Sequence, residues 1–226
     1  MTKVESFIVR GSVAEIPLCS FLLSDNERRQ YASYNVDMQL ASSDQLLIRE
    51  MGDSDKEYAL ILKWLTNPSV NEWYENRSDL TLDAIRTKYR PRVVGECHVR
   101  AAIIERQHKP IGYLQYYETQ KEKYRLKEPV LEEPNVWAMD IFIGEPTLFG
   151  KGLGSASLEL MLRFLFDQKG AKKVIVDPDV RNERAIRAYE KAGFRKLKRL
   201  KHWGTHIGQP TDAWLMVCKK PNARNP

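Results

Sequence analysis

Three closely spaced glycines, at Gly150, Gly152 and Gly154, form the stretch of this sequence best suited to binding an anion. They follow an apolar run, 136–143, that predicts a buried strand, and they open a run that predicts a helix over 153–168. The start of a helix presents unsatisfied backbone N–H groups and the positive end of the helix dipole. Glycine allows close approach and positive φ. The stretch therefore predicts a pyrophosphate-binding turn.

Two common phosphate-binding motifs do not fit this turn. A nucleoside-triphosphate loop needs Ser or Thr directly after its lysine, whereas Gly152 follows Lys151 here. A dinucleotide fingerprint has the spacing G-x-G-x-x-G, and these glycines run G-x-G-x-G. A turn that only caps the helix would use similar residues, so the rest of the chain has to decide between ligand binding and capping.

Composition and cysteine usage predict a cytoplasmic globular protein without a metal site. The chain has 226 residues, of which 42% are hydrophobic and 29% charged, which is enough to bury a core in one main domain. Its cysteines, Cys19, Cys97 and Cys218, are odd in number and scattered. This pattern argues against a disulfide framework and a zinc site and favours a reducing compartment.

The formal net charge of +6 raises the question of a nucleic-acid partner. The basic residues gather near the end of the chain, over 195–201 and 219–224, without a recognised nucleic-acid motif. A solvated basic face is therefore the better interpretation. No apolar run approaches the roughly 20 residues that span a bilayer. We expect neither a nucleic acid nor a membrane as partner.

Regular patterning begins at Leu46, which predicts an N-terminal extension over 1–45, a domain over 46–220 and a short tail over 221–226. The run 46–50 predicts a strand. A helix follows at 55–66, capped by Asp53 or Ser54 and ended by Asn67–Pro68. After a polar, aromatic loop, a second helix is expected at 81–89, capped by Asp79 or Thr81 and followed by Pro91.

From Cys97 onward the hydrophobic period changes to two, which predicts a meander of two strands with a turn at 107–110. The charged segment 118–135 is long for a hairpin connection and predicts a flap. After the glycine turn and its helix come a strand at 172–177, a helix at 183–192 and strands at 195–200 and 213–219. Asn182 is expected to cap this later helix. The order predicts an α+β fold: a mostly antiparallel mixed sheet with one parallel βαβ crossover.

With these elements in place, the chain from about 46 to 219 resembles the GNAT superfamily of acetyl-CoA-dependent N-acetyltransferases. The likeness rests on the glycine turn and on Asn182–x–x–Ala185–x–x–x–Tyr189–x–x–x–Gly193–Phe194, in this order and about thirty residues apart. One departure is Phe149, at a position where the family often has Gln or Arg.

Within that superfamily the chain is most similar to the aminoglycoside 6′-N-acetyltransferases, which acetylate an amine of these antibiotics and so confer resistance. The likeness is carried by Lys63–Trp64–Leu65, Glu72–Trp73–Tyr74, Pro110–Ile111–Gly112–Tyr113, Met139–Asp140–x–Phe142–Ile143–Gly144, Asp177–Pro178 and Arg184–Ala185–Ile186–Arg187–Ala188–Tyr189.

The resemblance implies a GNAT-like fold with acetyl-CoA as cosubstrate and no metal. It places the pantetheine arm between a splayed strand at 141–143 and the strand at 174–177. The residues expected to hold the cosubstrate are Ile141, Phe142, Ile143, Phe149, Gly150, Lys151, Gly152, Leu153, Gly154, Ser155, Asn182, Ala185 and Tyr189.

The expected chemistry is attack by a neutral amine on a thioester, so a group must accept the amine proton directly or through water. Asp140 stands at the position that the family uses for this, and it could equally serve as counter-ion to the ammonium. Backbone N–H groups of 141–143 are candidates for an oxyanion hole. Tyr189 could protonate the departing thiolate, or it could be a core aromatic.

The acceptor is expected to be a polycationic aminoglycoside bound in an acidic pocket of an otherwise basic protein, with the flap at 118–135 closing over it. Its expected contacts are Glu72, Trp73, Tyr74, Gln115, Tyr117, Asp140, Asp177 and Asp212. Another acyltransferase, acting for example on a siderophore hydroxylysine precursor or a protein amine, is the alternative within the fold. A basic adaptor without catalysis is the alternative outside it. The chain is expected to be a monomer or a homodimer.

Overall fold

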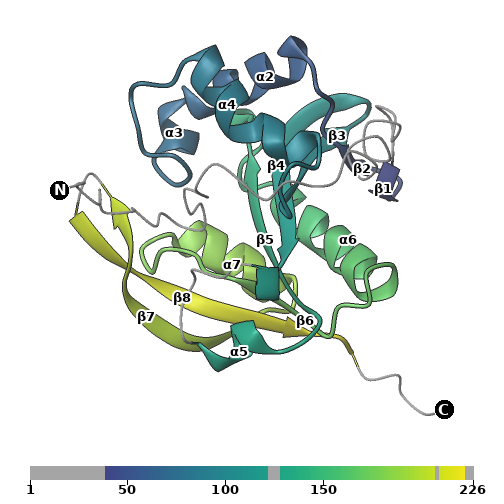
Figure 1. Ribbon diagram of the computed structural model, residues 1–226, viewed down its shortest axis with the longest axis vertical. Helices are drawn as coiled ribbons and strands as arrows, with labels where there is room; N and C mark the ends of the chain where they lie inside the picture. Colours follow the sequence, from purple (N-terminus) through teal and green to yellow (C-terminus); the bar gives the residue numbers. More distant parts are fainter. Residues whose placement is uncertain (1–38, 122–127, 207–208, 222–226) are drawn as a thin grey trace.

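One sheet of eight strands runs through the computed structural model, which describes residues 39–121, 128–206 and 209–221 (Figure 1). The strand order is β1-β2-β3-β4-β5-β6-β8-β7, and within these described ranges only β5 and β6 pair in parallel. This confirms the predicted mixed, mostly antiparallel sheet. The strands are β1 (Gln39–Ser42), β2 (Leu46–Glu50), β3 (Arg100–Arg106), β4 (Lys109–Glu118), β5 (Val136–Ile143), β6 (Lys173–Val176), β7 (Arg195–His206) and β8 (Gln209–Lys219).

Helices cover both faces of the sheet, and each face has its own hydrophobic core (Figure 1). On one face α6 and α7 pack against alternate residues of the strands, including Ile104 and Met139. On the other face α2 and α4 pack against Ile103 and Phe142. The helices are α2 (Asp55–Leu65), α3 (Pro68–Asn71), α4 (Leu82–Val93), α5 (Pro129–Glu132), α6 (Leu153–Asp167) and α7 (Glu183–Lys191).

Strands β5 and β6 separate along their length. Their parallel register covers only Val136–Ala138 of β5, although β5 continues to Ile143 and remains paired with β4 throughout. The second half of β5 therefore has an edge that β6 does not cover. This confirms the expected splay and leaves room for a groove between β5 and the elements that follow β6.

Local signals set most helix ends as predicted. Ser54 and Thr81 accept hydrogen bonds from backbone N–H groups at the starts of α2 and α4, and Asn182 does so for α7. Gly193 follows α7 with φ of 97°, the left-handed conformation that glycine adopts easily. These caps depend on residues within three positions of one another, which is why sequence alone finds them.

One of the two prolines expected at helix ends behaves differently from the prediction. Pro91 was expected to follow the second helix, but α4 continues through it to Val93. A proline inside a helix removes one backbone hydrogen bond and costs about 3 kcal/mol. The extra turn buries Arg92, so tertiary contacts offset that cost. Pro68 does end α2, and it also begins the short helix α3, where its missing N–H is not needed.

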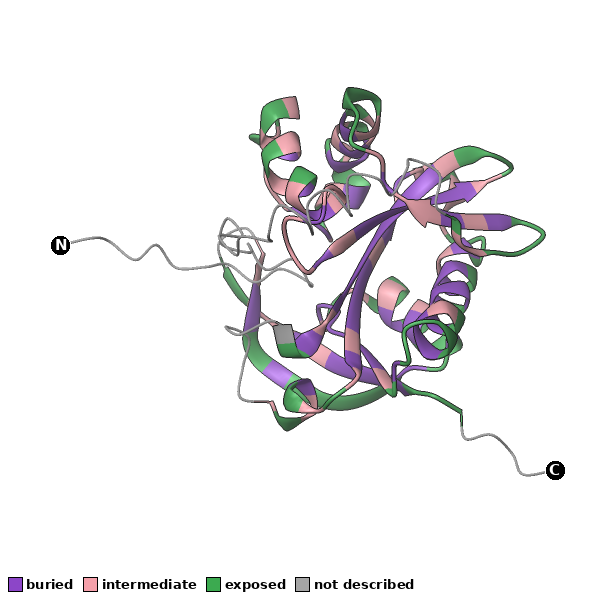
Figure 2. Ribbon diagram, turned by 45° about the vertical axis from the view of Figure 1, so that its right-hand side comes forward, coloured by how far each residue is buried: buried purple, intermediate pink, exposed green. Residues whose placement is uncertain are grey.

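The sequence pattern does not predict β1, which lies in the region assigned to the N-terminal extension. This strand pairs with β2, and Leu40 and Ala41 pack against the core beneath α6. Strands β7 and β8 are also longer than predicted and form a hairpin whose outer strand, β7, is largely exposed (Figure 2). Of the other predicted segments, residues 1–38, 122–127 and 222–226 lie outside the described residues.

Within the part of the chain that the structure describes, no helix combines the length and apolar character needed to cross a bilayer. Among the described residues, Cys97 and Cys218 are not joined in a disulfide bond.

Candidate active site

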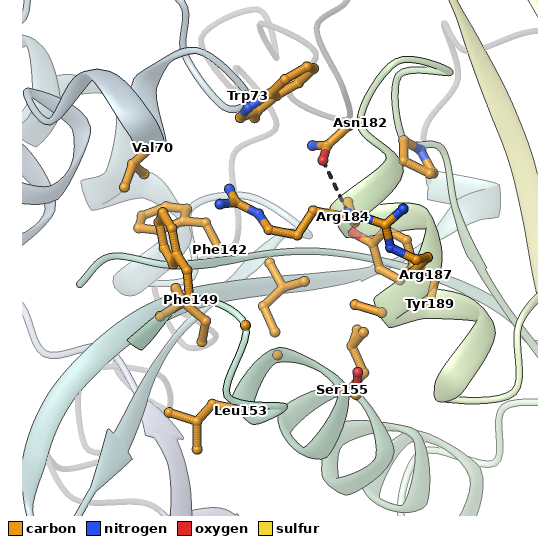
Figure 3. Close-up of a pocket in the computed structure, with 18 of the residues that line it drawn as sticks. Val70, Trp73, Phe142, Phe149, Leu153, Ser155, Asn182, Arg184, Arg187 and Tyr189 are labelled. Atoms are coloured by element: carbon orange, nitrogen blue, oxygen red, sulfur yellow. Dashed lines mark hydrogen bonds between the residues drawn. The ribbon is translucent and has the colours of Figure 1, made fainter. Parts of the chain in front are cut away.

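A groove of about 530 Å³ opens where β5 separates from β6 (Figure 3). One wall is the exposed edge of β5 and the glycine turn that follows it, and the other is the start of α7. Residues after α3 cover one end. The lining includes Val70, Trp73, Tyr74, Ile141, Phe142, Ile143, Leu148, Phe149, Gly150, Gly152, Leu153, Gly154, Ser155, Asn182, Arg184, Ala185, Arg187, Tyr189 and Lys191.

The glycine turn has the geometry of an anion cradle. Gly150 and Gly152 have φ of 74° and 77°, and Gly152 is the residue that precedes the first turn of α6. A methyl group added at Gly150, Gly152 or Gly154 would meet no other heavy atom within 4 Å. The space beside these main-chain amides is therefore open to a ligand, and no side chain of the described residues caps the α6 N-terminus.

Phe149, the departure from the family pattern, supports an arginine. The guanidinium of Arg184 lies 4.1 Å from the centre of the Phe149 ring, and Figure 3 shows the side chain extending from α7 across the groove. Burial lowers the pKa of Arg184, while the charge of Glu72 raises it. Together with Arg187 and Lys191, Arg184 makes the α7 side of the groove basic.

The structure brings the predicted cosubstrate residues together with one exception. The β5 residues 141–143, the turn residues and the α7 residues Asn182, Ala185 and Tyr189 all line the groove. Lys151 is exposed and is not part of the lining. The amide oxygen of Asn182 accepts a hydrogen bond from the backbone N–H of Ala185 at 3.1 Å, so this residue caps α7 and also faces the groove.

Tyr189 is buried and lines the groove, and its ring packs edge-on against Phe194. Burial raises the pKa of Tyr189, and the negative charges of Asp140 and Asp177 raise it further. Its hydroxyl is therefore protonated at physiological pH and lies within electrostatic reach of both carboxylates.

Asp140 lies directly beside the groove but does not line it. The side chain is 1% exposed and belongs to the sheet face that carries Phe142, opposite to the α6 face. Its Oδ2 atom accepts a hydrogen bond of 2.6 Å from Nε2 of Gln115. Gln115 Oε1 in turn accepts hydrogen bonds from Arg92 and Tyr113, at 2.7 and 3.0 Å. The carboxylate is thus part of a buried polar network between β4, β5 and α4.

Tyr74 joins the groove to this polar region. Its ring packs 4.6 Å from Phe142 in an edge-to-face arrangement, and the residue lines the groove. Its buried hydroxyl has no hydrogen-bond partner among the described residues. Burial raises the pKa of Tyr74, and Asp140 is among the charges that raise it further. The prediction that Tyr74 supplies only an aromatic face leaves out this available hydroxyl.

Asp177 and Tyr117 meet at a separate small cavity of about 20 Å³, which they line together with Trp203. The indole N–H of Trp203 donates to Asp177 Oδ2 at 2.5 Å. Asp177 lies one residue beyond β6, and Asp140 is on the facing part of β5. The two buried carboxylates therefore flank the opening between these strands.

The remaining predicted acceptor residues divide into two groups. Trp73 stacks on His206 with ring centres 6.3 Å apart, which links the segment after α3 to the end of β7. The charge of Glu72 raises the pKa of Arg184, against the larger lowering by burial, so Glu72 lies within electrostatic reach of the α7 side of the groove.

Asp212 is not brought to the groove. It pairs with Arg199 at 2.8 Å and accepts a hydrogen bond from the backbone N–H of His202. The hydrogen bond from the His202 backbone N–H lowers the pKa of Asp212 most, and Arg199 lowers it further. The charge of Asp212 is therefore paired within the β7–β8 hairpin.

Sequence reasoning did not identify Arg92, Trp203 or His206 as site residues. Arg92 follows a proline that was expected to lie outside a helix, so no periodicity marked it as buried. Trp203 and His206 lie in the part of β7 beyond its predicted end. Their positions depend on how the hairpin curves around the sheet, which a local pattern does not record.

Comparisons with known proteins agree with this geometry. A family model described as acetyltransferase (GNAT) domain matches residues 53–202. Aminoglycoside N(6′)-acetyltransferase type 1 from Klebsiella pneumoniae is 31% identical over 156 residues, which cover 69% of this chain and 76% of the relative. N-hydroxyputrescine acetyltransferase from Acinetobacter baumannii is 26% identical over 164 residues, covering 72% of this chain and 73% of the relative.

A solved structure shows the same architecture with a ligand pair. The crystal structure of aminoglycoside acetyltransferase AAC(6′)-Ib in complex with coenzyme A and kanamycin superposes with a TM-score of 0.65 at 29% identity. The superposition covers 77% of this chain and 95% of that chain. The solved relative therefore has nearly its whole length in common with the fold described above.

Proposed function

Because the chain belongs to the GNAT acetyltransferase family, we propose that it transfers an acetyl group from acetyl-CoA to the 6′-amine of aminoglycosides and so confers resistance. The observation that carries the proposal is the placement of Asp140. This buried carboxylate directly precedes the β5 residues that line a groove with an open glycine turn. One residue step thus separates the lining of the groove, which begins at Ile141, from a group that can accept a proton.

We propose that the groove holds the cosubstrate. The open space beside Gly150, Gly152 and Gly154 fits a pyrophosphate that accepts hydrogen bonds from main-chain N–H groups. The uncovered edge of β5 at 141–143 offers further backbone groups to an extended pantetheine chain. Acetyl-CoA supplies an activated acyl group as a thioester. The protein has to hold the amine beside it and move the protons.

Asp140 is proposed to accept the proton of the attacking amine, directly or through water. As the nitrogen bonds to the acyl carbon and the carbon–sulfur bond breaks, the nitrogen loses a proton and the sulfur gains one. A carboxylate buried at 1% exposure also attracts the ammonium form of the substrate before reaction, so the counter-ion role precedes the base role at the same atoms.

Tyr189 is proposed to donate to the departing sulfur. Its raised pKa keeps the hydroxyl protonated but makes it a weak acid relative to an ordinary thiol, whose pKa is about 8.5. The negative charge of Asp140 contributes to that rise. When Asp140 takes the amine proton, its charge is neutralised, and Tyr189 becomes a better donor at the moment when the thiolate forms. The two groups are coupled through their electrostatic interaction.

The acceptor site is proposed to lie on the Asp140 face of the sheet, between the α2–α4 layer and the β7–β8 hairpin. Asp140 and Asp177 provide negative charge, and Trp73, Tyr74 and Tyr117 provide aromatic surface for sugar rings. Asp212 is left out because Arg199 pairs with it. The described residues of the predicted flap, 118–121 and 128–135, pack below β5, where Thr119 bonds to Leu131 and Val136.

A short polyamine or hydroxylamine is the second candidate acceptor. The relative named N-hydroxyputrescine acetyltransferase covers as much of this chain as the aminoglycoside enzyme does. The stacking of Trp73 on His206 joins the segment after α3 to the end of β7, and an acceptor site between these two elements would suit a narrow substrate. This candidate includes the siderophore precursors expected as an alternative from the sequence.

A thiol-release assay with acetyl-CoA tests the proposal. Kanamycin and ribostamycin would be compared with spermidine and N-hydroxyputrescine, and NMR of the product would locate the acetyl group. We expect turnover with the aminoglycosides, with the acetyl group on the 6′-nitrogen, and raised kanamycin tolerance in a susceptible strain that expresses the protein. Turnover with N-hydroxyputrescine alone would replace the first candidate by the second. Absence of amine-dependent thiol release would refute both.

A further inference from the structure

We propose that Arg92 positions Asp140 for catalysis and acts through the side chain of Gln115. This inference rests on the proposed role of Asp140 as proton acceptor. It also gives Gln115 a different role from the sugar contact expected from the sequence, because its amide is occupied inside the protein. Arg92 comes from α4, Gln115 from β4 and Asp140 from β5, so the chain of contacts crosses three elements.

All three side chains are almost fully buried. Arg92 is 3% exposed, Gln115 2% and Asp140 1%. Arg92 Nη1 donates to Gln115 Oε1 at 2.7 Å, and Gln115 Nε2 donates to Asp140 Oδ2 at 2.6 Å. Distances of this length are typical of hydrogen bonds that involve a charged partner. The positive and negative ends of the chain are thus joined by one neutral amide.

The network determines which way the Gln115 amide points. Arg92 has only donors, and the Tyr113 hydroxyl also donates to Gln115 Oε1, at 3.0 Å. Arg92 therefore selects the oxygen end of the amide, and the Tyr113 hydroxyl, which can donate or accept, donates to the same oxygen. The nitrogen end must then point to Asp140, where it can only donate. A flipped amide would place two donors against each other at one end and two acceptors at the other.

A buried guanidinium is expensive, so its presence calls for a reason. Removing a charge from water costs several kcal/mol even after the protein relaxes, and an apolar residue at such a position is often more stable. Arg49, another partly buried arginine, meets Glu57 and Glu105 directly. The Cζ atom of Arg92 instead lies 4.9 Å from the centre of the Tyr89 ring, and its guanidinium donates a hydrogen bond to Gln115, which in turn donates to Asp140. The described contacts favour a role in orienting that carboxylate.

The consequence is a carboxylate held in one orientation. With Oδ2 bonded to Gln115, the plane of the Asp140 carboxylate is set by groups from α4 and β4. Catalytic groups displaced by about 1 Å can lose up to about 100-fold in rate. Arg92 does not touch the groove. Its removal should therefore change turnover without changing how acetyl-CoA binds.

A double-mutant cycle tests this inference, with kanamycin as the acceptor. Arg92→Met keeps the length of the side chain and removes its charge and its donors. We expect Arg92→Met to lower kcat about 10- to 100-fold with an unchanged KM for acetyl-CoA. In an Asp140→Asn background the same change should lower kcat less than about twofold, because its effect passes through Asp140.

Two further variants keep the test interpretable. Gln115→Met removes the middle member of the hydrogen-bonded series Arg92–Gln115–Asp140 and should lower kcat as much as Arg92→Met does. Arg92→Lys keeps the positive charge and should retain part of the activity that Arg92→Met loses. The matched control is Arg90→Met, an exposed position on the same helix, which should leave kcat unchanged. Acetyl-CoA binding by calorimetry shows that each protein is folded; if Arg92→Met is not, Gln115→Met takes its place in the cycle.

The outcomes separate the two proposals. If Asp140→Asn leaves kcat unchanged, the proton-acceptor role fails and the positioning role fails with it. If Asp140→Asn is severe but Arg92→Met is harmless, only the positioning role fails. The positioning role would also be overturned if the loss of kcat in the double variant equalled the product of the two single losses, since Arg92 would then act independently of Asp140.

Discussion

The two sides of β5 are built in different ways. The groove side is made from two nearly continuous segments, 141–158 and 178–191, with one further contribution from α3 and the residues that follow it. The Asp140 side draws single residues from α4, β4, β5 and the segment after β6. Figure 2 shows how deeply the central strands between the two sides are buried. A neighbouring pair, Asp140 and Ile141, divides one side from the other.

The two sides differ in whether main-chain or side-chain atoms make the expected contacts. On the groove side the expected contacts are mostly main-chain N–H groups, which any residue with the right φ can present, so glycine spacing and a helix start are sufficient. On the Asp140 side the contacts are side-chain hydrogen bonds such as Gln115 to Asp140. These depend on residues far apart in sequence that packing brings within 3 Å.

The two sides also differ in charge. Arg184, Arg187 and Lys191 line the groove, whereas Asp140 and Asp177 lie on the other side. An anionic cosubstrate and a cationic acceptor would thus approach from regions of opposite charge. If the two sides are functionally separate, substitutions on one should spare the function of the other.

The largest expected effect is on the Asp140 side. Asp140→Asn keeps the shape of the side chain but removes the proton acceptor, so kcat should fall about 100-fold or more. The dissociation constant of acetyl-CoA, measured by calorimetry, should stay within twofold because Asp140 does not line the groove. A parallel loss of acetyl-CoA affinity would show that the two sides are not separable.

The reverse pattern is expected on the groove side. Gly152→Asp puts a negative side chain into the open space beside the α6 N-terminus and should raise the KM for acetyl-CoA about 10-fold or more. Gly170→Asp is the matched control, because Gly170 also has positive φ, at 67°, and open space around it but is not part of the groove lining. Equal KM changes in both variants would attribute the effect to backbone strain and contradict the cradle.

Tyr189 lines the groove and also interacts electrostatically with Asp140 and Asp177 of the other side. Tyr189→Phe removes the proposed proton donor to sulfur and should lower kcat, measured with both substrates saturating, about 10-fold. Burial raises the pKa of Tyr189, and the charges of Asp140 and Asp177 raise it further. The hydroxyl therefore keeps its proton as the pH rises and loses it only above this raised pKa. The wild-type kcat should therefore show no decline assignable to Tyr189 between pH 7 and its ordinary pKa of about 10. A decline in this range that is absent from Tyr189→Phe would contradict this assignment.

A smaller effect should appear in stability alone. Trp203→Phe leaves Asp177 without its indole donor, and an unsatisfied buried acceptor costs about 1–3 kcal/mol. The free energy of unfolding in urea should fall by that amount, while acetyl-CoA affinity should not change. Unchanged stability would indicate that Asp177 finds another partner and that this part of the network is not tightly defined.

The smallest effect concerns the domain boundary, which we propose to lie before β1 and not at residue 46. Deleting residues 1–38 should leave kcat and the KM for acetyl-CoA unchanged. Deleting residues 1–44 also removes Leu40 and Ala41 from the core and uncovers the edge of β2, so unfolding should need less urea. Equal stability of the two truncated proteins would place the boundary at residue 46, as the pattern alone suggests.

The sequence by itself determined the features that depend on neighbouring residues. The spans of β2 and β5, the caps at Ser54, Thr81 and Asn182, and the positive φ at Gly193 all follow from local patterning and backbone preference. The glycine turn and its position after β5 belong to this class as well. Such features appear in the order of the chain, and each is stabilised within a few residues.

Only the tertiary structure decided the composition of the Asp140 side. It carried α4 through Pro91 to bury Arg92, turned Gln115 toward Asp140, and kept Asp212 on the hairpin with Arg199. For the network around Asp140 the physical reason is that a buried polar group must find a partner wherever packing offers one, and these partners lie 23 and 25 positions apart in the sequence. No local pattern encodes which of the possible pairs will form.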